Sequence, residues 1–456
     1  MRLKNNFLAL VATLCLGPLM LASAQKRDLP QYVIDEFGQP PVIPTGELSP
    51  ALADTVQLVF VDAVTQPGWE HDQLAGLQAI VQSADPRLVW HIADMVRFYR
   101  NQSTYVPMVE AASSLLGKDM RGFNPWNNIT NHLIAWDIPA PPNYLAVKRV
   151  VFTKVEPDWQ PLFVEGDIDW RWVSWGGVLM DTRAYDQTHE PCNCIPAADN
   201  PRAVPAEHPD AQWLDDDTIV FGVQINGEAR AYPRRIMEVR EMVNDSLGGR
   251  DLAIPYCTLC GAAQAFFTDN MPVGVERPIL RTSGLLSRSN KVMYDLGTNS
   301  LFDTFLGKAV TGPLADIGLT LDQAPVVTTT WAQWRLAHPQ TTVLVEALAL
   351  GRDFDFRAGR DARGPIFPIG DVDPRLGVQE DVVGVIAPTG QAIAFPAVEA
   401  QLALQRGQAV MLEGVQLVAD AGGLRAIDET GTALPSHQAF WFAWSQFHPG
   451  TLVWTD

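Results

Sequence analysis

The feature that most constrains the fold is a residue pattern that occurs twice in the C-terminal half of the chain. Residues 331–339 read Trp-x-x-Trp-x-x-x-His-Pro, and residues 441–449 repeat the same spacing. Because proline cannot continue a helix, each copy predicts a short helix that ends near the His-Pro pair and turns its tryptophans toward the core. His338 and His448 occur in both copies, so we interpret them as structural rather than catalytic.

A second repeat precedes the first in both halves. Segment 222–233 begins with Gly and ends with Tyr-Pro, and segment 384–396 begins with Gly and ends with Phe-Pro, with one additional residue. Two unrelated matches in the same order indicate an internal duplication within residues 195–456, with copies at about 195–350 and 351–456. The second copy is shorter because it lacks the middle of the first.

Short strands and turns are predicted throughout this duplicated region. Residues 220–232 contain Asn226-Gly227, the pair that two-residue hairpin turns prefer, between two segments of strand composition. Residues 236–243 have the spacing of a short helix, and the apolar segment 252–256 predicts a strand. We therefore expect a β-rich α+β domain here.

Residues 51–142 carry helical rather than strand periodicity. Apolar residues recur three and four positions apart within 74–81 and within 88–99, and Asp85-Pro86 has the composition of a helix start. The pattern predicts a helical-hairpin N-terminal domain of the HEAT-like type.

Two further segments border this helical region. Residues 25–50 are rich in proline and polar residues, which predicts an extended arm. Residues 143–194 form an aromatic-rich connector. Its clustered tryptophans could offer a platform for a sugar ring, but packing between structural units is the commoner use, so we expect packing. The tryptophans are Trp159, Trp170, Trp172 and Trp175.

Residues 1–24 have the three regions of a secretory signal peptide. Arg2 and Lys4 supply the positive start, residues 7–21 are an almost unbroken apolar run, and residues 22–24 are small. The run is shorter than the roughly 20 residues that cross a bilayer. We therefore expect cleavage, export to the periplasm or the exterior, and no transmembrane segment in the mature protein.

The charge balance excludes one class of partner. The chain has 52 acidic and 33 basic side chains, for a net charge of -19. Nucleic-acid binding needs clustered Lys and Arg against phosphates, so we expect no nucleic-acid partner. The acidity also disfavours docking on an anionic membrane, and it suits solubility outside the cytoplasm.

Cys257 and Cys260 are the candidate functional residues. Two cysteines at this spacing can form a metal knuckle, a reducible disulfide, a nucleophilic site or a structural bridge. A site for zinc or another thiophilic metal needs further ligands, and Glu241, Asp245 and His189 are candidates. The sequence leaves these alternatives open.

The remaining candidate ligands have weaker spacing. Cys192 and Cys194 could complete a zinc site, but two cysteines separated by one residue have poor geometry for zinc. Glu241 and Asp245 share one face if the helix continues to Asp245, and paired carboxylates could then bind a metal or transfer protons.

Several motifs occur in a fixed order across residues 195–456: Ile195-Pro-Ala-Ala-Asp-Asn-Pro201, Gly227-Glu-Ala-Arg-Ala-Tyr-Pro233, Glu241-Met-Val-Asn-Asp245, Tyr256-Cys-Thr-Leu-Cys260, Ser283-Gly-Leu285, Met293-Tyr-Asp295 and Trp441-Phe-Ala-Trp444. In these motifs the chain resembles the domain-of-unknown-function 3179 family. The resemblance implies a bacterial or archaeal exported domain with a Tyr-Cys-x-x-Cys signature, and it implies no particular activity.

Two positions depart from the family pattern. Arg240 stands where the family tends to place His directly before the Glu of the Glu-x-x-Asn-Asp motif, and Phe302 stands where Trp is usual. If that His is a ligand or a base in relatives, the departure implies a weakened or inactive member.

Two functions agree with these features. The first is a cell-envelope binding or scaffold protein that recognises an envelope protein or a small ligand. The second is a metal-binding or thiol-redox protein that uses Cys257 and Cys260. A bound metal or a reactive thiol would favour the second, and an inert pair the first.

The signal peptide generates the first testable prediction. We expect the mature chain to begin at Gln25, because residues 22–24 supply the cleavage site. Intact-mass measurement on exported protein checks this, and a mass that retains residues 1–24 would contradict it.

Overall fold

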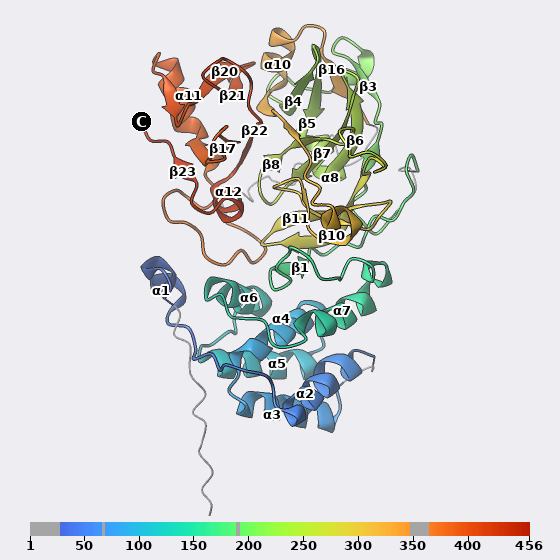
Figure 1. Ribbon diagram of the computed structural model, residues 1–456, viewed down its shortest axis with the longest axis vertical. Helices are drawn as coiled ribbons and strands as arrows, with labels where there is room; N and C mark the ends of the chain where they lie inside the picture. Colours follow the sequence, from blue (N-terminus) through green and yellow to red (C-terminus); the bar gives the residue numbers. More distant parts are fainter. Residues whose placement is uncertain (1–27, 66–68, 188–191, 347–363) are drawn as a thin grey trace, which may run out of the picture.

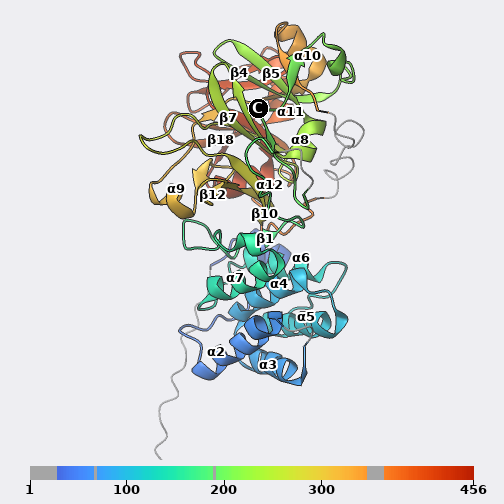
Figure 2. The same cartoon turned by 90° about the vertical axis from the view of Figure 1, so that its right-hand side faces the viewer.

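The computed structural model describes residues 28–65, 69–187, 192–346 and 364–456. A helical region forms one end of the molecule and a β-rich region forms the other (Figure 1). After a turn of 90° the two regions remain stacked along the long axis, with β1 at their junction (Figure 2). The protein is therefore α+β, with the N-terminal helices and most strands in separate regions.

The helical region begins earlier than the sequence predicted. Residues 31–37 lie in the expected extended arm, yet they form α1, because Val33 and Phe37 are one turn apart and both are buried in the helical core. The side chain of Asp85 accepts a hydrogen bond from the backbone N–H of Arg87, as expected of a helix start. The helices are α1 (Gln31–Phe37), α2 (Pro50–Val56), α3 (His71–Gln82), α4 (Val89–Phe98), α5 (Gln102–Leu116), α6 (Pro125–Ala135) and α7 (Tyr144–Val155). Of the helices in the described residues, none combines the length and apolar character needed to cross a bilayer.

The connector joins the helices to the β-rich region through shared packing. Trp159 is fully buried, and its indole N–H donates to the carbonyl oxygen of Ser283 at 2.7 Å. Arg97 on α4 donates to the carbonyl oxygen of Trp175 at 2.7 and 2.9 Å. One hydrophobic core includes residues of the helices, the connector and the adjacent sheet. The tryptophans of the connector therefore pack between structural units.

The first half of the β-rich region is built on a five-stranded sheet of order β15-β4-β5-β16-β3. Strands β4 and β5 form the predicted hairpin, and Asn226 and Gly227 at its turn both have positive φ, 49° and 88°. Helix α10 (Trp331–Ala337) joins β15 to β16. The strands are β3 (Ala203–Pro205), β4 (Ile219–Ile225), β5 (Glu228–Pro233), β15 (Val327–Thr330) and β16 (Thr342–Leu344).

Two more sheets are built mainly from strands that lie between β5 and β15 in the sequence, and each also includes one strand that precedes β4. One has the order β14-β9-β7-β6-β2, with β8 paired to β7, and the other has the order β1-β10-β11-β12-β13. The short helix α9 (Gly312–Asp316) follows β13. The strands are β1 (Val173–Trp175), β2 (Ala198–Asp199), β6 (Met242–Leu247), β7 (Arg250–Cys257), β8 (Ala262–Ala263), β9 (Ala265–Phe267), β10 (Leu280–Ser287), β11 (Asn290–Asp295), β12 (Leu301–Asp303), β13 (Lys308–Ala309) and β14 (Gln323–Ala324).

The helix predicted over residues 236–243 is wrong at its C-terminal end. Helix α8 (Arg234–Arg240) stops at Arg240, Glu241 adopts a left-handed conformation with φ of 53°, and β6 begins at Met242. Strand β6 pairs with β7 along its whole length, so the backbone hydrogen bonds of the sheet replace those of a longer helix. The proposed helical face shared by Glu241 and Asp245 therefore does not exist.

The second half is built on a four-stranded sheet of order β22-β17-β18-β23 beside a three-stranded sheet of order β19-β20-β21. Strand β23 runs parallel to β18, just as β16 runs parallel to β5 in the first half. The elements are β17 (Asp381–Ile386), β18 (Ala392–Pro396), α11 (Ala397–Gln405), β19 (Val410–Leu412), β20 (Val415–Asp420), β21 (Gly423–Ile427), β22 (Ser436–Phe440), α12 (Trp441–Phe447) and β23 (Leu452–Val453).

The repeated tryptophans make the same contacts in the two halves. Trp334 and Trp444 are 0% and 1% exposed, which confirms their predicted burial. The indole N–H donates to Thr341 in one half and to Thr451 in the other, at 2.9 Å in both. The histidine that ends each helix lies with its ring centroid 4.1 Å from the tryptophan ring. The histidines therefore have the packing role that the repeat predicted.

The first glycine of each repeat has a steric reason. Gly222 and Gly384 lie directly beneath the two tryptophan rings, and a Cβ atom would fall 2.2 Å and 2.1 Å from the nearest ring atoms. A real Cβ cannot approach so closely, so only glycine, which has no side chain, can lie beneath each ring.

Gly384→Ala tests this requirement. The new methyl group would push Trp444 off its position, and overpacking of this kind costs about 1–3 kcal/mol of the free energy of unfolding. Urea denaturation measures the loss. Gly377→Ala is the matched control, because Gly377 is exposed and its Cβ would meet only the Glu380 side chain at 3.4 Å. Equal stability of the two variants would contradict the steric argument.

Candidate functional site

Cys257 and Cys260 lie at a tight turn between the long strand β7 and the two-residue strand β8. Cys257 ends β7 and pairs with Ala262 of β8, so the intervening residues reverse the chain, with Gly261 at a positive φ of 64°. The backbone N–H of Cys260 points at the Cys257 sulfur at 3.3 Å, and the two sulfur atoms lie 2.7 Å apart. The backbone thus holds the two thiols against each other.

The turn between β10 and β11 covers the two sulfurs. The carbonyl oxygen of Ser289 lies 3.7 Å from the Cys257 sulfur and 3.6 Å from the Cys260 sulfur. The side-chain oxygen of Asn290 lies 3.5 Å from the Cys260 sulfur. Cys257 is 4% exposed and Cys260 is 0% exposed. The pair is therefore shielded from any large partner in this conformation.

The two thiols differ in acidity. Burial alone would raise the pKa of Cys257, but hydrogen bonds from the Cys260 thiol and from the backbone N–H groups of Lys291, Cys260 and Leu259 outweigh it and lower the pKa. Burial, together with the hydrogen bond to Cys257 and its charge, raises the pKa of Cys260 well above its usual range. Cys257 is therefore the more acidic thiol of the pair and Cys260 the less acidic one.

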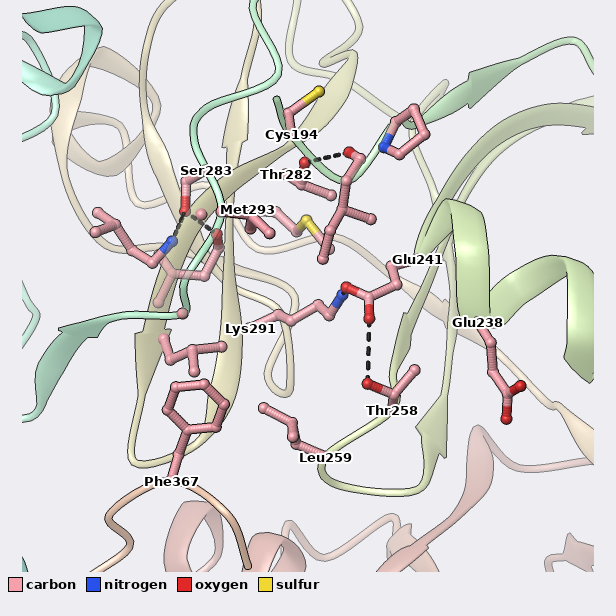
Figure 3. A pocket seen from close by; sticks show the side chains of 18 of the residues that line it. Cys194, Glu238, Glu241, Thr258, Leu259, Thr282, Ser283, Lys291, Met293 and Phe367 are labelled. Carbon is pink, nitrogen blue, oxygen red and sulfur yellow. Dashed lines mark hydrogen bonds and ion pairs between the residues drawn. The ribbon is translucent and has the colours of Figure 1, made fainter. Parts of the chain in front are cut away.

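Glu241 lies beside the same turn. Its carbonyl oxygen accepts a hydrogen bond from the backbone N–H of Tyr256 at 2.9 Å, which places Glu241 level with the start of the cysteine turn. Its carboxylate forms an ion pair with Lys291 of β11 and accepts a hydrogen bond from the Thr258 hydroxyl at 3.1 Å (Figure 3). Glu241 and Lys291 are 5% and 6% exposed. A buried ion pair therefore connects α8, the cysteine turn and β11.

A pocket of about 380 Å³ opens over this ion pair. Its walls come from the segment after β1, the end of α8, the cysteine turn, β10, β11 and the loop at Phe367 (Figure 3). Most of the lining is apolar, including Leu259, Leu285 and Met293. Glu241, Lys291 and Thr258 form its polar end.

Asp245 lies away from the cysteine pair. It pairs with Leu252 across the β6–β7 ladder, five residues before Cys257, which is about 16 Å along the strand. Its carboxylate accepts hydrogen bonds from Arg230 at 2.6 Å and from the Tyr232 hydroxyl at 2.7 Å. The structure thus brings Glu241 to the cysteine turn and engages Asp245 in a separate ion pair.

Cys192 and Cys194 form a disulfide with each other. With Asp181 they make the one group of three or more candidate metal ligands found within the described residues. The sulfurs of a disulfide are not thiolates, and the Asp181 carboxylate accepts two hydrogen bonds from Arg183 at 2.7 Å. This group does not fit a metal in its present state. Cys194 also lines the pocket.

The cysteine turn does not fit a zinc knuckle as it stands. Two thiolates on one tetrahedral zinc ion, each about 2.3 Å from the metal, lie about 3.8 Å apart. The sulfurs of Cys257 and Cys260 are at 2.7 Å, and Glu241 is neutralised by Lys291. His189, the other candidate ligand, lies outside the described residues.

Sequence reasoning missed Lys291 and Thr258. The sequence does carry a signal for Lys291, because it is the one basic residue in the strand Asn290–Asp295, whose residues are all buried. Arg240, which departs from the family pattern, donates to Glu346 at 2.6 Å and to the carbonyl oxygen of Pro196 at 3.3 Å. Arg240 therefore braces the loop that carries Pro196, another residue lining the pocket.

The fold and the site together define an α+β protein with a buried cysteine pair beside an apolar pocket. A family model described as "Protein of unknown function (DUF3179)" matches residues 192–422, just over half of the chain. The chain belongs to this family. No curated protein and no solved structure matches the chain.

Lys291→Met tests the buried ion pair. The substitution leaves the Glu241 carboxylate buried without its counter-ion, and breaking such a pair costs about 3–5 kcal/mol of the free energy of unfolding. The double variant Glu241→Gln/Lys291→Met removes both charges, so it should recover most of the free energy of unfolding that the single variant Lys291→Met loses. Urea denaturation of the three proteins measures the difference. Equal destabilisation by the single and double variants would contradict a coupled pair.

Proposed function

We propose that the protein is an exported thiol-redox protein in which Cys257 and Cys260 interconvert between a dithiol and a disulfide. The observation that carries the proposal is the placement of the two sulfurs, 2.7 Å apart in one turn. A disulfide at this position requires only a small movement, because bonded sulfurs lie at about 2.05 Å.

The difference in acidity assigns the two roles. The lowered pKa of Cys257 favours its thiolate, which is the nucleophile in thiol–disulfide exchange. The Cys257 thiolate attacks one sulfur of a substrate disulfide, forms a mixed disulfide and releases the other sulfur as a thiolate. Cys260 then loses its proton and attacks the Cys257 sulfur, which closes the Cys257–Cys260 bond and releases the second substrate thiolate.

Export supports this chemistry. The predicted signal peptide in residues 1–24 would direct the chain to the periplasm or the exterior, where disulfides form and persist. The Cys192–Cys194 disulfide agrees with an oxidising compartment. Metal binding at the cysteine turn is the weaker alternative, because the sulfurs would first have to separate.

A cell-envelope binding or scaffold protein is the second candidate function. The observation that favours it is a cavity of about 480 Å³ in the helical region, lined by residues of α2 and α7 and remote in the chain from the cysteine turn. Such a role requires no chemistry at Cys257 and Cys260, so an inert pair would support it.

The matched contacts of the two halves also support an origin by duplication. In this proposal the ancestral unit contained the β-hairpin, the tryptophan helix and the parallel strand that follows it. The first copy alone then retained or gained two sheets. The sheet of β6 and β7 carries the cysteine turn, and the sheet of β10 and β11 carries the turn that covers the two sulfurs.

Redox cycling tests the proposed function. Reduced protein incubated with hydroxyethyl disulfide should lose two hydrogens and show a Cys257–Cys260 bond in peptide mapping. Cys260→Ser should accumulate a mixed disulfide on Cys257, whereas Cys257→Ser should react at least about tenfold more slowly, because the remaining thiol is buried and protonated.

Cys192→Ser/Cys194→Ser is the matched control, and it should keep the cycling of the other pair. The proposal fails if both thiols stay unmodified in folded protein. It also fails if the purified protein holds one zinc ion per chain that leaves when Cys257 is replaced by Ser.

A further inference from the structure

The pocket over Glu241 and Lys291 has the form of a built binding site. Its volume of about 380 Å³ lies in the range of about 300–1,000 Å³ that is usual for small-molecule sites. Strand β10 bulges between Thr282 and Leu285, and a Cβ on Gly284 would lie 2.4 Å from the carbonyl oxygen of Val178. The wall therefore depends on a close backbone approach that only glycine allows.

Two residues beside this pocket have backbone conformations that favour glycine. Glu241, at its polar end, and Ser289, in the turn behind Lys291, have positive φ values of 53° and 72°. Non-glycine residues adopt this region at a cost, and such residues cluster at functional sites. The surrounding packing therefore holds the polar end in a conformation that the local sequence does not favour.

The charges at the polar end cancel. The Lys291 ammonium is paired with the Glu241 carboxylate, and Figure 3 shows the Glu238 carboxylate pointing away from this pair. Glu238 lies instead 3.6 Å from Arg234. A charged ligand would have to enter an apolar pocket without a free counter-charge, which is costly. The pocket therefore suits an uncharged molecule whose polar group accepts a hydrogen bond from the Lys291 ammonium.

The cysteine pair lies directly behind this polar end. Thr258 and Leu259, the two residues between the cysteines, both line the pocket. The backbone N–H of Lys291 interacts with the Cys257 sulfur, while the Lys291 side chain reaches Glu241 in the pocket. Thr258, Leu259 and Lys291 therefore lie between the cysteine pair and a molecule bound in the pocket.

We propose that this pocket binds a small quinone and that the Cys257–Cys260 dithiol reduces it. This inference rests on the proposed function and names its substrate class. Oxidation of a dithiol releases two electrons and two protons, and a quinone is an uncharged, largely apolar dicarbonyl that accepts both. Two S–H bonds break and one S–S bond forms, while the quinone gains two O–H bonds and becomes the hydroquinone. The Lys291 ammonium is placed to donate a hydrogen bond to the carbonyl oxygen at which negative charge develops, while the Thr258 hydroxyl donates to the Glu241 carboxylate.

Anaerobic oxidation of the reduced full-length protein by duroquinone tests this proposal. All ring positions of duroquinone carry methyl groups, so thiols do not add to the ring as they do with simpler quinones. We expect one equivalent of hydroquinone per chain, a disulfide that maps to Cys257–Cys260, and a rate that saturates with quinone concentration.

Glu241→Gln/Lys291→Met keeps the pocket and removes its polar end. The saturable rate with duroquinone should fall by about tenfold or more relative to the rate with hydroxyethyl disulfide, which is measured on the same variant to correct for any shift of the cysteine pair. Arg230→Met/Asp245→Asn is the matched control, because it removes an ion pair of similar burial outside the pocket. Thermal melting confirms that each variant is folded, and Thr258→Val provides a second, milder test of the polar end.

The outcomes separate this inference from the function on which it rests. If the cysteine pair is oxidised by hydroxyethyl disulfide but not by duroquinone, the quinone site is wrong and the redox function stands. A rate that rises linearly with duroquinone, or that is equal in the double variant, also overturns the site. If no oxidant closes the Cys257–Cys260 bond in folded protein, both proposals are wrong.

Discussion

The buried ion pair between Glu241 and Lys291 is the interaction on which the geometry of the site depends. Removing two charges from water costs several kcal/mol for each ion, and the attraction offsets that cost only when both side chains are held in place. Glu241 is held by the end of α8 and by the hydrogen bond from Tyr256, and Lys291 by its strand. Because Lys291 also contacts the Cys257 sulfur through its backbone, the position of that sulfur follows from the same pair.

The regular parts of the fold could be predicted because their signals are local. The Asn226-Gly227 turn, the helix start at Asp85 and the burial of Trp334 and Trp444 each follow from a few neighbouring residues. The end of α8 could not be predicted in this way. Its helical spacing continues past Arg240, and the strand that replaces it depends on pairing with β7, which only the folded chain supplies.

The site was predicted only in part, for the same reason. The spacing of Cys257 and Cys260 made the turn a candidate, and Glu241, one of the candidate ligands, lies beside it. The helix that was expected to align Glu241 with Asp245 ends at Arg240. Five strands, β6 to β10, lie between Glu241 and Lys291 in the chain, so no spacing rule connects the two residues. Asp245 shows the converse error, because closeness in sequence to Glu241 suggested a shared role, whereas the extended strand β6 carries Asp245 away from the cysteine turn to Arg230.

The hydrophobic core that the helices share with the β-rich region determines the smallest part of this chain that can fold independently. The family match begins at residue 192, yet β10 pairs with β1, and Ser283 of that same strand accepts the indole N–H of Trp159. A chain cut at residue 192 would expose the edge of β10 and the apolar surface that the connector covers, and bare strand edges promote aggregation. The helices and the β-rich region should therefore unfold together in a single cooperative transition, and the folding unit extends beyond residues 192–422 that the family model matches.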